Sequence, residues 1–396
     1  MIREMLLFVI AVFSVSVLLL APLSGNFSNT VFDKKEYEAK SHTTQNNEDK
    51  IVFIPVPNPP ENKEGEIIEN VVPAERQEIT YSEPEPMDIV LNVLEQQEAE
   101  NTQPETINLY NFPAISFDEI NILAREALVN ILCTAGTTSI SPISASGVLI
   151  HHSGIILTNA HVGQYLLLEQ DPRIAISCEI RTGSPAKSTY DAELVYLPPT
   201  WVNEHALQIS ELRPLGTGEH DWAILRITRR IDGGPLPTAF PFLPLEIREA
   251  AGFTEDPVLL ASYPAGFIDG NTVQNNLYAA STITNIKKLY TFLDGSVDLL
   301  SLGGVIVAQG GSSGGAVMNA WNHLIGIIVT SSDAENTSER DLRAITIAHV
   351  DRSIRNQVGI GLLEFISSDI NAKASDFRLN IAPGLIEQFI PFLQEV

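Results

Sequence analysis

The chain is poor in cysteine and in basic residues, and each shortage excludes a class of protein. Its 396 residues include only two cysteines, too few for a cysteine-dense secreted scaffold or for a zinc site with four cysteine ligands. The 24 Lys and Arg residues stand against 49 Asp and Glu, which gives a formal net charge of −25. So acidic a chain offers no cluster of positive charge to neutralise nucleic-acid phosphates or to dock on anionic lipid. We therefore expect no nucleic-acid partner.

Cofactor signatures are missing as well. The sequence has no His-Glu-x-x-His motif, no Walker phosphate loop and no dinucleotide-binding fingerprint. We therefore expect neither a metal nor an organic cofactor. What the chain does have is 44 % apolar residues, enough for a sizeable core. Its length allows two or three domains, or one large domain with extensions.

Residues 1–25 form the first of four predicted regions. Residues 5–21 are apolar except for Ser14 and Ser16, a run long for the core of a signal peptide and slightly short for a full membrane span. Residues 21–25 offer no clean cleavage site, so an uncleaved membrane anchor is favoured over a removed signal peptide. Either interpretation exports the rest of the chain.

Residues 26–117 form the second region, which we predict to be a disordered stalk. This region holds 18 acidic and 6 basic residues together with several prolines. Such a composition buries too little apolar area to offset the loss of chain entropy on folding. Proline and the repulsion between like charges should keep the segment extended.

The third region, residues 118–355, has the pattern of an all-β domain. Ser116 to Glu119 has the spacing of a capping box and predicts a short helix. Short apolar runs separated by turn signals follow, which is typical of small antiparallel barrels. The expected fold is two six-stranded antiparallel β-barrels followed by a helical extension, residues 356–396. The predicted strands are 128–134, 145–151, 154–159, 174–181, 191–196 and 222–227, then 257–262, 270–286, 304–307, 316–318, 324–331 and 345–349.

Three short segments carry candidate catalytic residues. A strand delivers His161 after small residues, Asp221 stands at the start of an apolar strand, and Ser313 lies in the glycine-dense segment 310–316. A serine hydroxyl needs a base within hydrogen-bond reach, and the base needs an anion to orient it. Ser313, His161 and Asp221 are predicted to fill these roles. The backbone N–H groups of Gly311 and Ser313 are predicted to bind the developing oxyanion.

Taken in this order, the three segments resemble the trypsin-like (chymotrypsin-fold) serine peptidases, and most of all the bacterial HtrA/Do type. The matching stretches are Ser146-Gly147-Val148-Leu149-Ile150, Ile156-Leu157-Thr158-Asn159-Ala160-His161-Val162, Asp221-Trp222-Ala223-Ile224-Leu225, Gly311-Ser312-Ser313-Gly314-Gly315-Ala316 and Leu324-Ile325-Gly326-Ile327. The resemblance covers about residues 124–354. It implies a double barrel with the triad in the cleft between the barrels. It also implies a location in the bacterial cell envelope, outside the cytoplasm.

A second motif competes with this interpretation. Residues 311–315 also satisfy the G-x-S-x-G nucleophile elbow of α/β-hydrolases, with Asp341 and His349 following in the required order. That fold demands a helix directly after the serine. The segment after Gly315 reads as β-rich, and no alternating strand-helix pattern is present, so the trypsin-like interpretation is favoured. Five other histidines are expected to be structural: His151, His152, His205, His323 and His349.

The chain departs from the family at several places. Activation by a freed N-terminus depends in the family on an Asp directly before the nucleophile, where this chain has Ser312. The oxyanion loop must therefore be set in another way, by packing or by substrate. HtrA/Do enzymes usually carry PDZ modules, but about 45 residues after the barrels are too few for one.

The resemblance also assigns a specificity pocket and a disulfide. The pocket floor falls at Val307 with Ala308 beside it, and Val329, Thr330 and Ser331 should line the wall. Without a buried anion there, we expect small or medium apolar residues before the scissile bond. In this barrel topology Cys133 and Cys178 lie on neighbouring strands. We predict that they form a disulfide; two buried free thiols are the alternative.

The sequence thus predicts a serine endopeptidase that cleaves exported proteins and is held at a membrane by its apolar N-terminal segment. Two alternatives remain open: a catalytically idle trypsin-like fold that binds peptides, and an esterase on the same scaffold. The oligomeric state is not predicted.

Overall fold

The computed structural model describes residues 110–136, 140–210, 217–249, 251–266, 268–292, 295–305, 307, 309–331 and 341–393. The predicted anchor and nearly all of the predicted stalk lie outside these residues. Within the described part of the chain, none of the helices is both long and apolar enough to cross a membrane.

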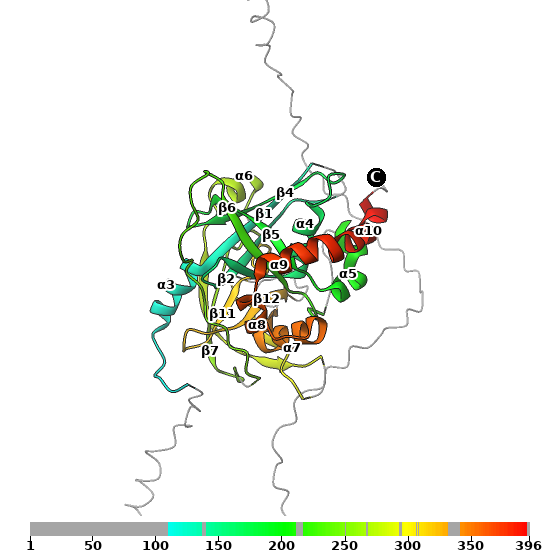
Figure 1. The fold of residues 1–396 in the computed structure, drawn as a ribbon. Helices are drawn as coiled ribbons and strands as arrows, with labels where there is room; N and C mark the ends of the chain where they lie inside the picture. The colour runs from blue at the N-terminus through cyan, green and yellow to red at the C-terminus, as the bar shows by residue number, and fades with distance from the viewer. Residues whose placement is uncertain are drawn as a thin grey trace, which may run out of the picture. The chain divides into compact units, whose positions relative to one another are not determined.

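The first half of the folded chain is a closed six-stranded antiparallel barrel, as predicted, with strand order β1-β2-β3-β6-β5-β4 (Figure 1). β3 is buried at every residue, and β1 and β2 are buried at most of theirs. Strands with so much buried surface favour a sheet that closes on itself around a core. The strands are β1 (Leu128–Ala135), β2 (Ile143–His151), β3 (Ile155–Thr158), β4 (Ile176–Thr182), β5 (Lys187–Tyr196) and β6 (Ala223–Arg230).

Cys133 and Cys178 are directly opposite each other on β1 and β4 and form a disulfide, as predicted. Their backbones are adjacent because the pairing of β1 with β4 closes the barrel. The disulfide therefore joins the first and fourth strands at the closure, across 45 residues of sequence.

The second half is a seven-stranded antiparallel sheet with the order β8-β7-β11-β12-β13-β10-β9, curled into a half-barrel, where six strands were predicted. Asp269 explains one difference: its carboxylate accepts the N–H groups of Asn271 and Thr272, and this cap starts a helix where a strand was predicted. Residues 304–307 form no strand in their described positions. The strands are β7 (Pro257–Ser262), β8 (Ala280–Asn285), β9 (Lys288–Tyr290), β10 (Leu299–Gly303), β11 (Ala316–Met318), β12 (Leu324–Ser331) and β13 (Leu342–Thr346).

Helices surround the two sheets. The predicted cap is present at the first described helix, where Ser116 Oγ accepts the N–H of Glu119, one of the two hydrogen bonds of a capping box. The helical extension is also present, and its helices α9 and α10 pack on the first barrel at β5, α4 and α5 (Figure 1). The helices are α3 (Phe117–Ala127), α4 (Ala160–Leu168), α5 (Pro199–His205), η1 (Ala206–Ser210), α6 (Gly270–Asn275), α7 (Ile347–Val358), α8 (Leu362–Ser367), α9 (Ile370–Asp376), η3 (Phe377–Ile381) and α10 (Ala382–Leu393).

The core has two parts. The larger cluster fills the first barrel and continues into the C-terminal helices through Ile354, Phe365 and Phe389, while the smaller one lies within the second sheet. The helical extension therefore shares the core of the first barrel, and its burial rigidifies the strands that carry the candidate site.

Candidate active site

His161 and Asp221 meet because the strands that end beside them are paired. His161 is the second residue of α4, which only Asn159 separates from β3, and Asp221 lies two residues before β6. Strands β3 and β6 run antiparallel with Thr158 opposite Ala223. The end of one strand therefore adjoins the start of the other, which brings the two side chains to the same edge of the barrel.

The pair has two hydrogen bonds. Nδ1 of His161 lies 2.8 Å from Oδ2 of Asp221, and the backbone N–H of His161 donates to Oδ1 at 3.0 Å. Asp221 is 5 % exposed, so water competes little for its carboxylate. Burial alone would lower the pKa of His161, but the charge of Asp221 and its hydrogen bond outweigh burial and raise the pKa above its ordinary value.

The residues before and after Asp221 contact Ser353 of α7 through hydrogen bonds. Ser353 Oγ accepts the indole N–H of Trp222 at 3.0 Å and lies 3.1 Å from Nδ1 of His220. His220 has a φ of 59°, in the left-handed region that costs energy for a residue with a side chain. Asn159 Nδ2 also donates to the backbone carbonyl of Asp221 at 3.0 Å. These contacts hold the aspartate in place.

The loop that carries Ser313 is held by backbone hydrogen bonds. Ser312 donates its N–H to Gln309 at 3.2 Å, which closes a turn whose third residue, Gly311, has a φ of 91°. The carbonyl of Gly310 accepts the N–H of Ala265 at 2.6 Å, and the carbonyl of Ser312 accepts the N–H of Gly315 at 2.9 Å. Strand β11 then begins directly after the loop.

Three N–H groups within residues 310–315 have no protein partner among the described residues: those of Gly310, Gly311 and Ser313. In a trans peptide the N–H points away from the carbonyl of the same unit. The carbonyls of Gly310 and Ser312 are each bound within the protein, so the N–H groups of Gly311 and Ser313 are directed away from those contacts. Paired free N–H groups beside a serine are the arrangement that stabilises an oxyanion.

Ser146 of β2 links the loop to the first barrel. Its backbone N–H donates to the carbonyl of Ser313 at 2.8 Å, and its hydroxyl donates to the carbonyl of Gly311 at 2.8 Å. The approach is so close that a Cβ on Gly314 would lie 2.1 Å from the carbonyl oxygen of Ser146. Only glycine fits there, and its φ of 81° is also one that glycine readily adopts.

Ser313 and His161 themselves are not hydrogen-bonded to each other in the described structure. Their loops are nevertheless connected, since Thr158, at the end of the strand before His161, donates its hydroxyl to the carbonyl of Ser146 at 2.8 Å. In free enzymes the bond between nucleophile and base is often long and tightens only when substrate binds.

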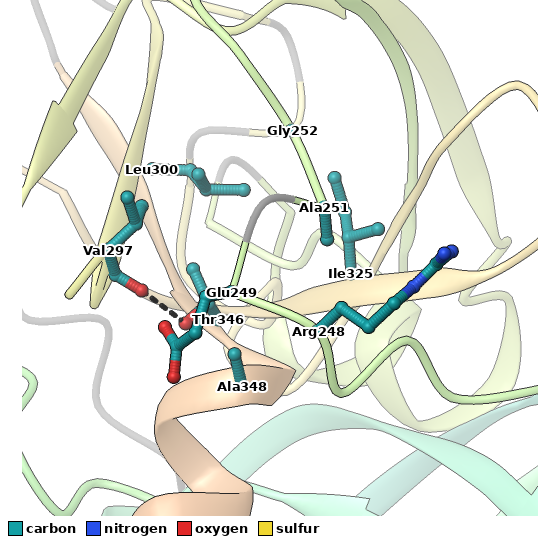
Figure 2. Close-up of a pocket in the computed structure, with 9 residues that line it drawn as sticks. All are labelled: Arg248, Glu249, Ala251, Gly252, Val297, Leu300, Ile325, Thr346 and Ala348. Carbon is teal, nitrogen blue, oxygen red and sulfur yellow. Dashed lines mark hydrogen bonds between the residues drawn. The ribbon is translucent and has the colours of Figure 1, made fainter. Parts of the chain in front are cut away.

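Of the predicted specificity residues, Val329, Thr330 and Ser331 lie on β12 of the second sheet, and Val307 lies in a turn outside its strands. Val307 and Val329 are buried, Thr330 and Ser331 are the last residues of β12, and Ala308 is outside the described residues. One pocket in the described part of the chain lies elsewhere (Figure 2) and contains none of these residues. Its lining residues are Arg248, Glu249, Ala251, Gly252, Val297, Leu300, Ile325, Thr346 and Ala348.

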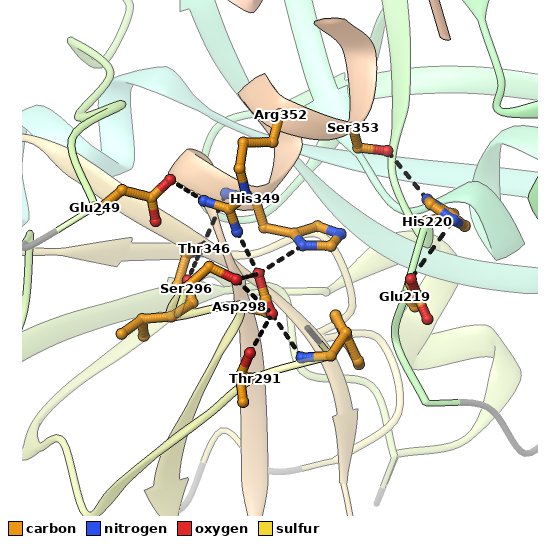
Figure 3. A network of polar contacts seen from close by, with 12 residues as sticks. Glu219, His220, Glu249, Thr291, Ser296, Asp298, Thr346, His349, Arg352 and Ser353 are labelled. Carbon is orange, nitrogen blue, oxygen red and sulfur yellow. Dashed lines mark hydrogen bonds and ion pairs between the residues drawn. The ribbon is translucent and has the colours of Figure 1, made fainter. Parts of the chain in front are cut away.

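The α/β-hydrolase interpretation is wrong. A strand, β11, follows Ser313, where that fold requires a helix. His349 instead pairs with buried Asp298, their Nδ1 and Oδ1 atoms 2.9 Å apart, in a network that includes Arg352 (Figure 3). Asp341 accepts the hydroxyl of Ser301 and pairs with Arg343.

Sequence reasoning did not identify the residues that hold the site. Ser146 stands in one of the matching stretches, yet nothing in its neighbourhood indicates a contact with a loop 165 residues away. Ser353 lies on α7, before the predicted helical extension, and was not singled out. The one signal for Ser146 is its place directly before the apolar run 147–150, because a hydroxyl buried with such a run needs a hydrogen-bond partner.

Comparison with known proteins gives a family for the central part of the chain. Residues 145–327 match the family model described as the trypsin-like peptidase domain. No curated protein matches. Similar solved structures include the HtrA-type protease AlgW with a decapeptide, at 18 % identity and a TM-score of 0.40, covering 61 % of this chain and 67 % of that one. The same protease with a tripeptide has 21 % identity and a TM-score of 0.40, covering 62 % and 65 %.

Proposed function

Residues 145–327 match the family model of the trypsin-like peptidase domain, and from that premise we propose that the protein is a serine endopeptidase with His161, Asp221 and Ser313 as its catalytic triad. The observation that carries the proposal is the pair of N–H groups on Gly311 and Ser313 that have no protein partner among the described residues, in a loop whose carbonyls at positions 309–313 are all hydrogen-bonded within the protein. Such a loop is built to receive a negatively charged oxygen next to a serine.

The residues act in the following order. His161 accepts the hydroxyl proton of Ser313 at Nε2 as Ser313 Oγ attacks the peptide carbonyl, and the carbonyl oxygen becomes an oxyanion. The N–H groups of Gly311 and Ser313 stabilise that oxyanion. The protonated His161, stabilised by Asp221, then gives its proton to the leaving amine, which departs and leaves an acyl-enzyme. Water, deprotonated by His161, hydrolyses the acyl-enzyme and restores Ser313.

The substrate class is part of the proposal. Val307 and Val329 place apolar side chains in the region expected to form the pocket, and an apolar pocket favours small or medium apolar residues before the scissile bond. The apolar segment at residues 5–21 supports an extracytoplasmic location with exported proteins as substrates. Cleavage of a peptide library tests the preference. Fractionation of cells that express the full chain tests the location.

Labelling of the full chain with a fluorophosphonate probe tests the proposal directly. The expected result is labelling of the parent protein that is lost in Ser313→Ala and strongly reduced in His161→Ala. Cleavage of a matched amide and ester pair then separates a peptidase from an esterase. A folded parent that neither reacts with the probe nor cleaves any peptide contradicts the proposal.

The second candidate function is an idle trypsin-like fold that binds peptides. The observation that favours it is the lack of a hydrogen bond between Ser313 Oγ and the His161 ring, both of which the structure describes. An idle fold binds library peptides without acylation, so peptide binding by a folded parent that resists the fluorophosphonate would support this candidate.

A further inference from the structure

Ser146 joins three segments that the chain brings together from far apart. It is completely buried on β2 of the first barrel. The backbone N–H of Tyr263, directly after β7 of the second sheet, donates to Ser146 Oγ at 2.8 Å. Ser146 Oγ in turn donates to the carbonyl of Gly311 at 2.8 Å. One hydroxyl thus connects the first barrel, the second sheet and the nucleophile loop.

The two bonds assign both roles of the hydroxyl. A serine hydroxyl has one proton to donate, and Ser146 donates it to the carbonyl oxygen of Gly311. A lone pair of the same oxygen accepts the backbone N–H of Tyr263. A chain of N–H to O–H to carbonyl is cooperative, since each bond polarises the next. Because the site is buried, water cannot replace the hydroxyl at low cost. The carbonyl of Gly311 is therefore held in one direction.

The orientation of that carbonyl matters for the N–H groups of Gly311 and Ser313. Gly311 has φ of 91°, and glycine can adopt many other backbone conformations, so its own preferences do not fix the turn. A change in the backbone dihedral angles of Gly311 would turn its N–H group to a different direction. It would also displace Ser313, two residues later. The hydroxyl of Ser146 restrains one side of Gly311, and the N–H of Ala265, bound to the Gly310 carbonyl at 2.6 Å, restrains the other.

Ser312, the residue before the nucleophile, is also restrained by a neutral contact. Ser312 is 1 % exposed, and its hydroxyl accepts a hydrogen bond from Ser262 Oγ at 3.1 Å. The position carries no charge that would need a freed N-terminus as a partner. The neutral contacts from β2 and from the end of β7 hold the loop instead.

We propose that Ser146 is a positioning residue that keeps the oxyanion-binding N–H groups of Gly311 and Ser313 aligned without any activating cleavage. The inference rests on the proposed function for its kinetic consequence, but the restraint on the loop is a property of the folded protein alone. Ser146 does not touch the substrate; it acts through Gly311.

The test compares Ser146→Ala with Ser301→Ala in the full chain. Ser301 is a matched control because its hydroxyl is also buried and hydrogen-bonded, but to Asp341, which directly precedes β13 and, among the described residues, has no hydrogen bond to the nucleophile loop. For Ser146→Ala we expect kcat to fall about ten- to a hundred-fold with KM changed less than about threefold, since only transition-state binding is lost. A peptide boronic acid, which mimics the tetrahedral state, should bind more weakly by the same factor. Ser301→Ala should keep the parental kcat.

A second measurement does not need activity. Amide hydrogen exchange across residues 309–315 should be faster in Ser146→Ala than in the parent or in Ser301→Ala, because the loop loses its restraint. If Ser146→Ala fails to fold, Ser146→Cys replaces it; its thiol is a weaker donor, so a smaller loss of kcat and a smaller rise in exchange are expected.

The outcomes separate this inference from the proposed function. A parent that does not react with fluorophosphonate overturns the proposed function, and faster exchange confined to Ser146→Ala still supports the restraint. A folded Ser146→Ala with unchanged kcat overturns the inference, as does unchanged exchange in the loop. An equal loss of kcat in Ser301→Ala overturns it too, because the effect would then be one of general stability.

Discussion

His161 engages both carboxylate oxygens of Asp221, one through its ring Nδ1 at 2.8 Å and the other through its backbone N–H at 3.0 Å. The backbone bond fixes the carboxylate relative to the start of α4, and the ring bond then fixes the imidazole. Because Nδ1 carries the proton that faces Asp221, Nε2 is left as the acceptor in the neutral ring. Both the position and the tautomer of the base therefore depend on one carboxylate.

Asp221→Asn should consequently change both the rate and its pH dependence. The base works as neutral imidazole, so activity should rise with pH through the pKa of His161, which Asp221 holds above its ordinary value. Without that charge the pKa falls and the profile should move to lower pH, while kcat drops by about ten-thousand-fold because the ring loses the favoured tautomer. The profile of kcat/KM against pH measures both effects. Asp232→Asn, at an exposed position paired with Arg230, is the control, and a profile that stays in place in Asp221→Asn would contradict the assignment.

The sequence predicts what depends on local pattern. All six strands of the first barrel and the helix capped by Ser116 follow from apolar runs and turn signals. The pairing of Cys133 with Cys178 followed only from the resemblance, because neighbours across a barrel closure are set by topology.

What the sequence does not predict depends on contacts between distant segments. The turn at Gly311 depends on Ser146 and Ala265, and no local pattern records either contact. Helix α6 was predicted as part of a strand because a short cap at Asp269 outweighs the strand propensity around it. Tyr110 lies in the region predicted to be a stalk, yet it is buried, because its partners Glu246 and Asn319 are more than a hundred residues away.

The disulfide should contribute measurably to stability. Closing a loop with a sequence separation of 45 removes unfolded-state entropy worth about 4 kcal/mol in the chain-entropy treatment. The paired variant Cys133→Ala with Cys178→Ala should therefore unfold at lower denaturant concentration than the oxidised parent. Alkylation of the unfolded, unreduced parent should label neither cysteine. Labelling of both, or equal stability of the parent and the paired variant, would count against a structural role.

Gly163 of α4 should tolerate no larger residue. A Cβ at this position would lie 2.6 Å from the Cβ of Ala223 and 3.2 Å from Leu197. Gly163→Ala must push α4 away from β6, at a cost of about 1–3 kcal/mol for overpacking. Because His161 and Asp221 lie at the ends of these same two elements, activity should fall along with the melting temperature. Gly384→Ala is the control, since nothing lies within 4 Å of a Cβ there; similar effects of the two substitutions would show that the packing argument is wrong.

Tyr110 should anchor the segment before α3 to the second sheet. Its hydroxyl donates to Glu246 Oε2 at 2.6 Å and accepts from Asn319 Nδ2 at 2.6 Å, while its ring stacks on Trp321. Tyr110→Phe removes one hydrogen-bond donor from the buried carboxylate of Glu246 and should destabilise the fold by about 1–3 kcal/mol. Denaturant unfolding at neutral pH measures the loss, and Tyr278→Phe, at an exposed tyrosine, is the control.

The same substitution should change how stability depends on pH. Burial would raise the pKa of Glu246, but hydrogen bonds from Arg248 and Tyr110 outweigh burial and lower the pKa to about 2. A lowered folded-state pKa stabilises the protein above the ordinary glutamate value, and this stability is lost as the pH falls toward the folded-state value. Without the Tyr110 hydroxyl the pKa of Glu246 rises. Between neutral pH and pH 2, the free energy of unfolding should therefore decrease less for Tyr110→Phe than for the parent. Parallel stability curves for the two proteins would show that the hydroxyl does not interact with the charge of Glu246.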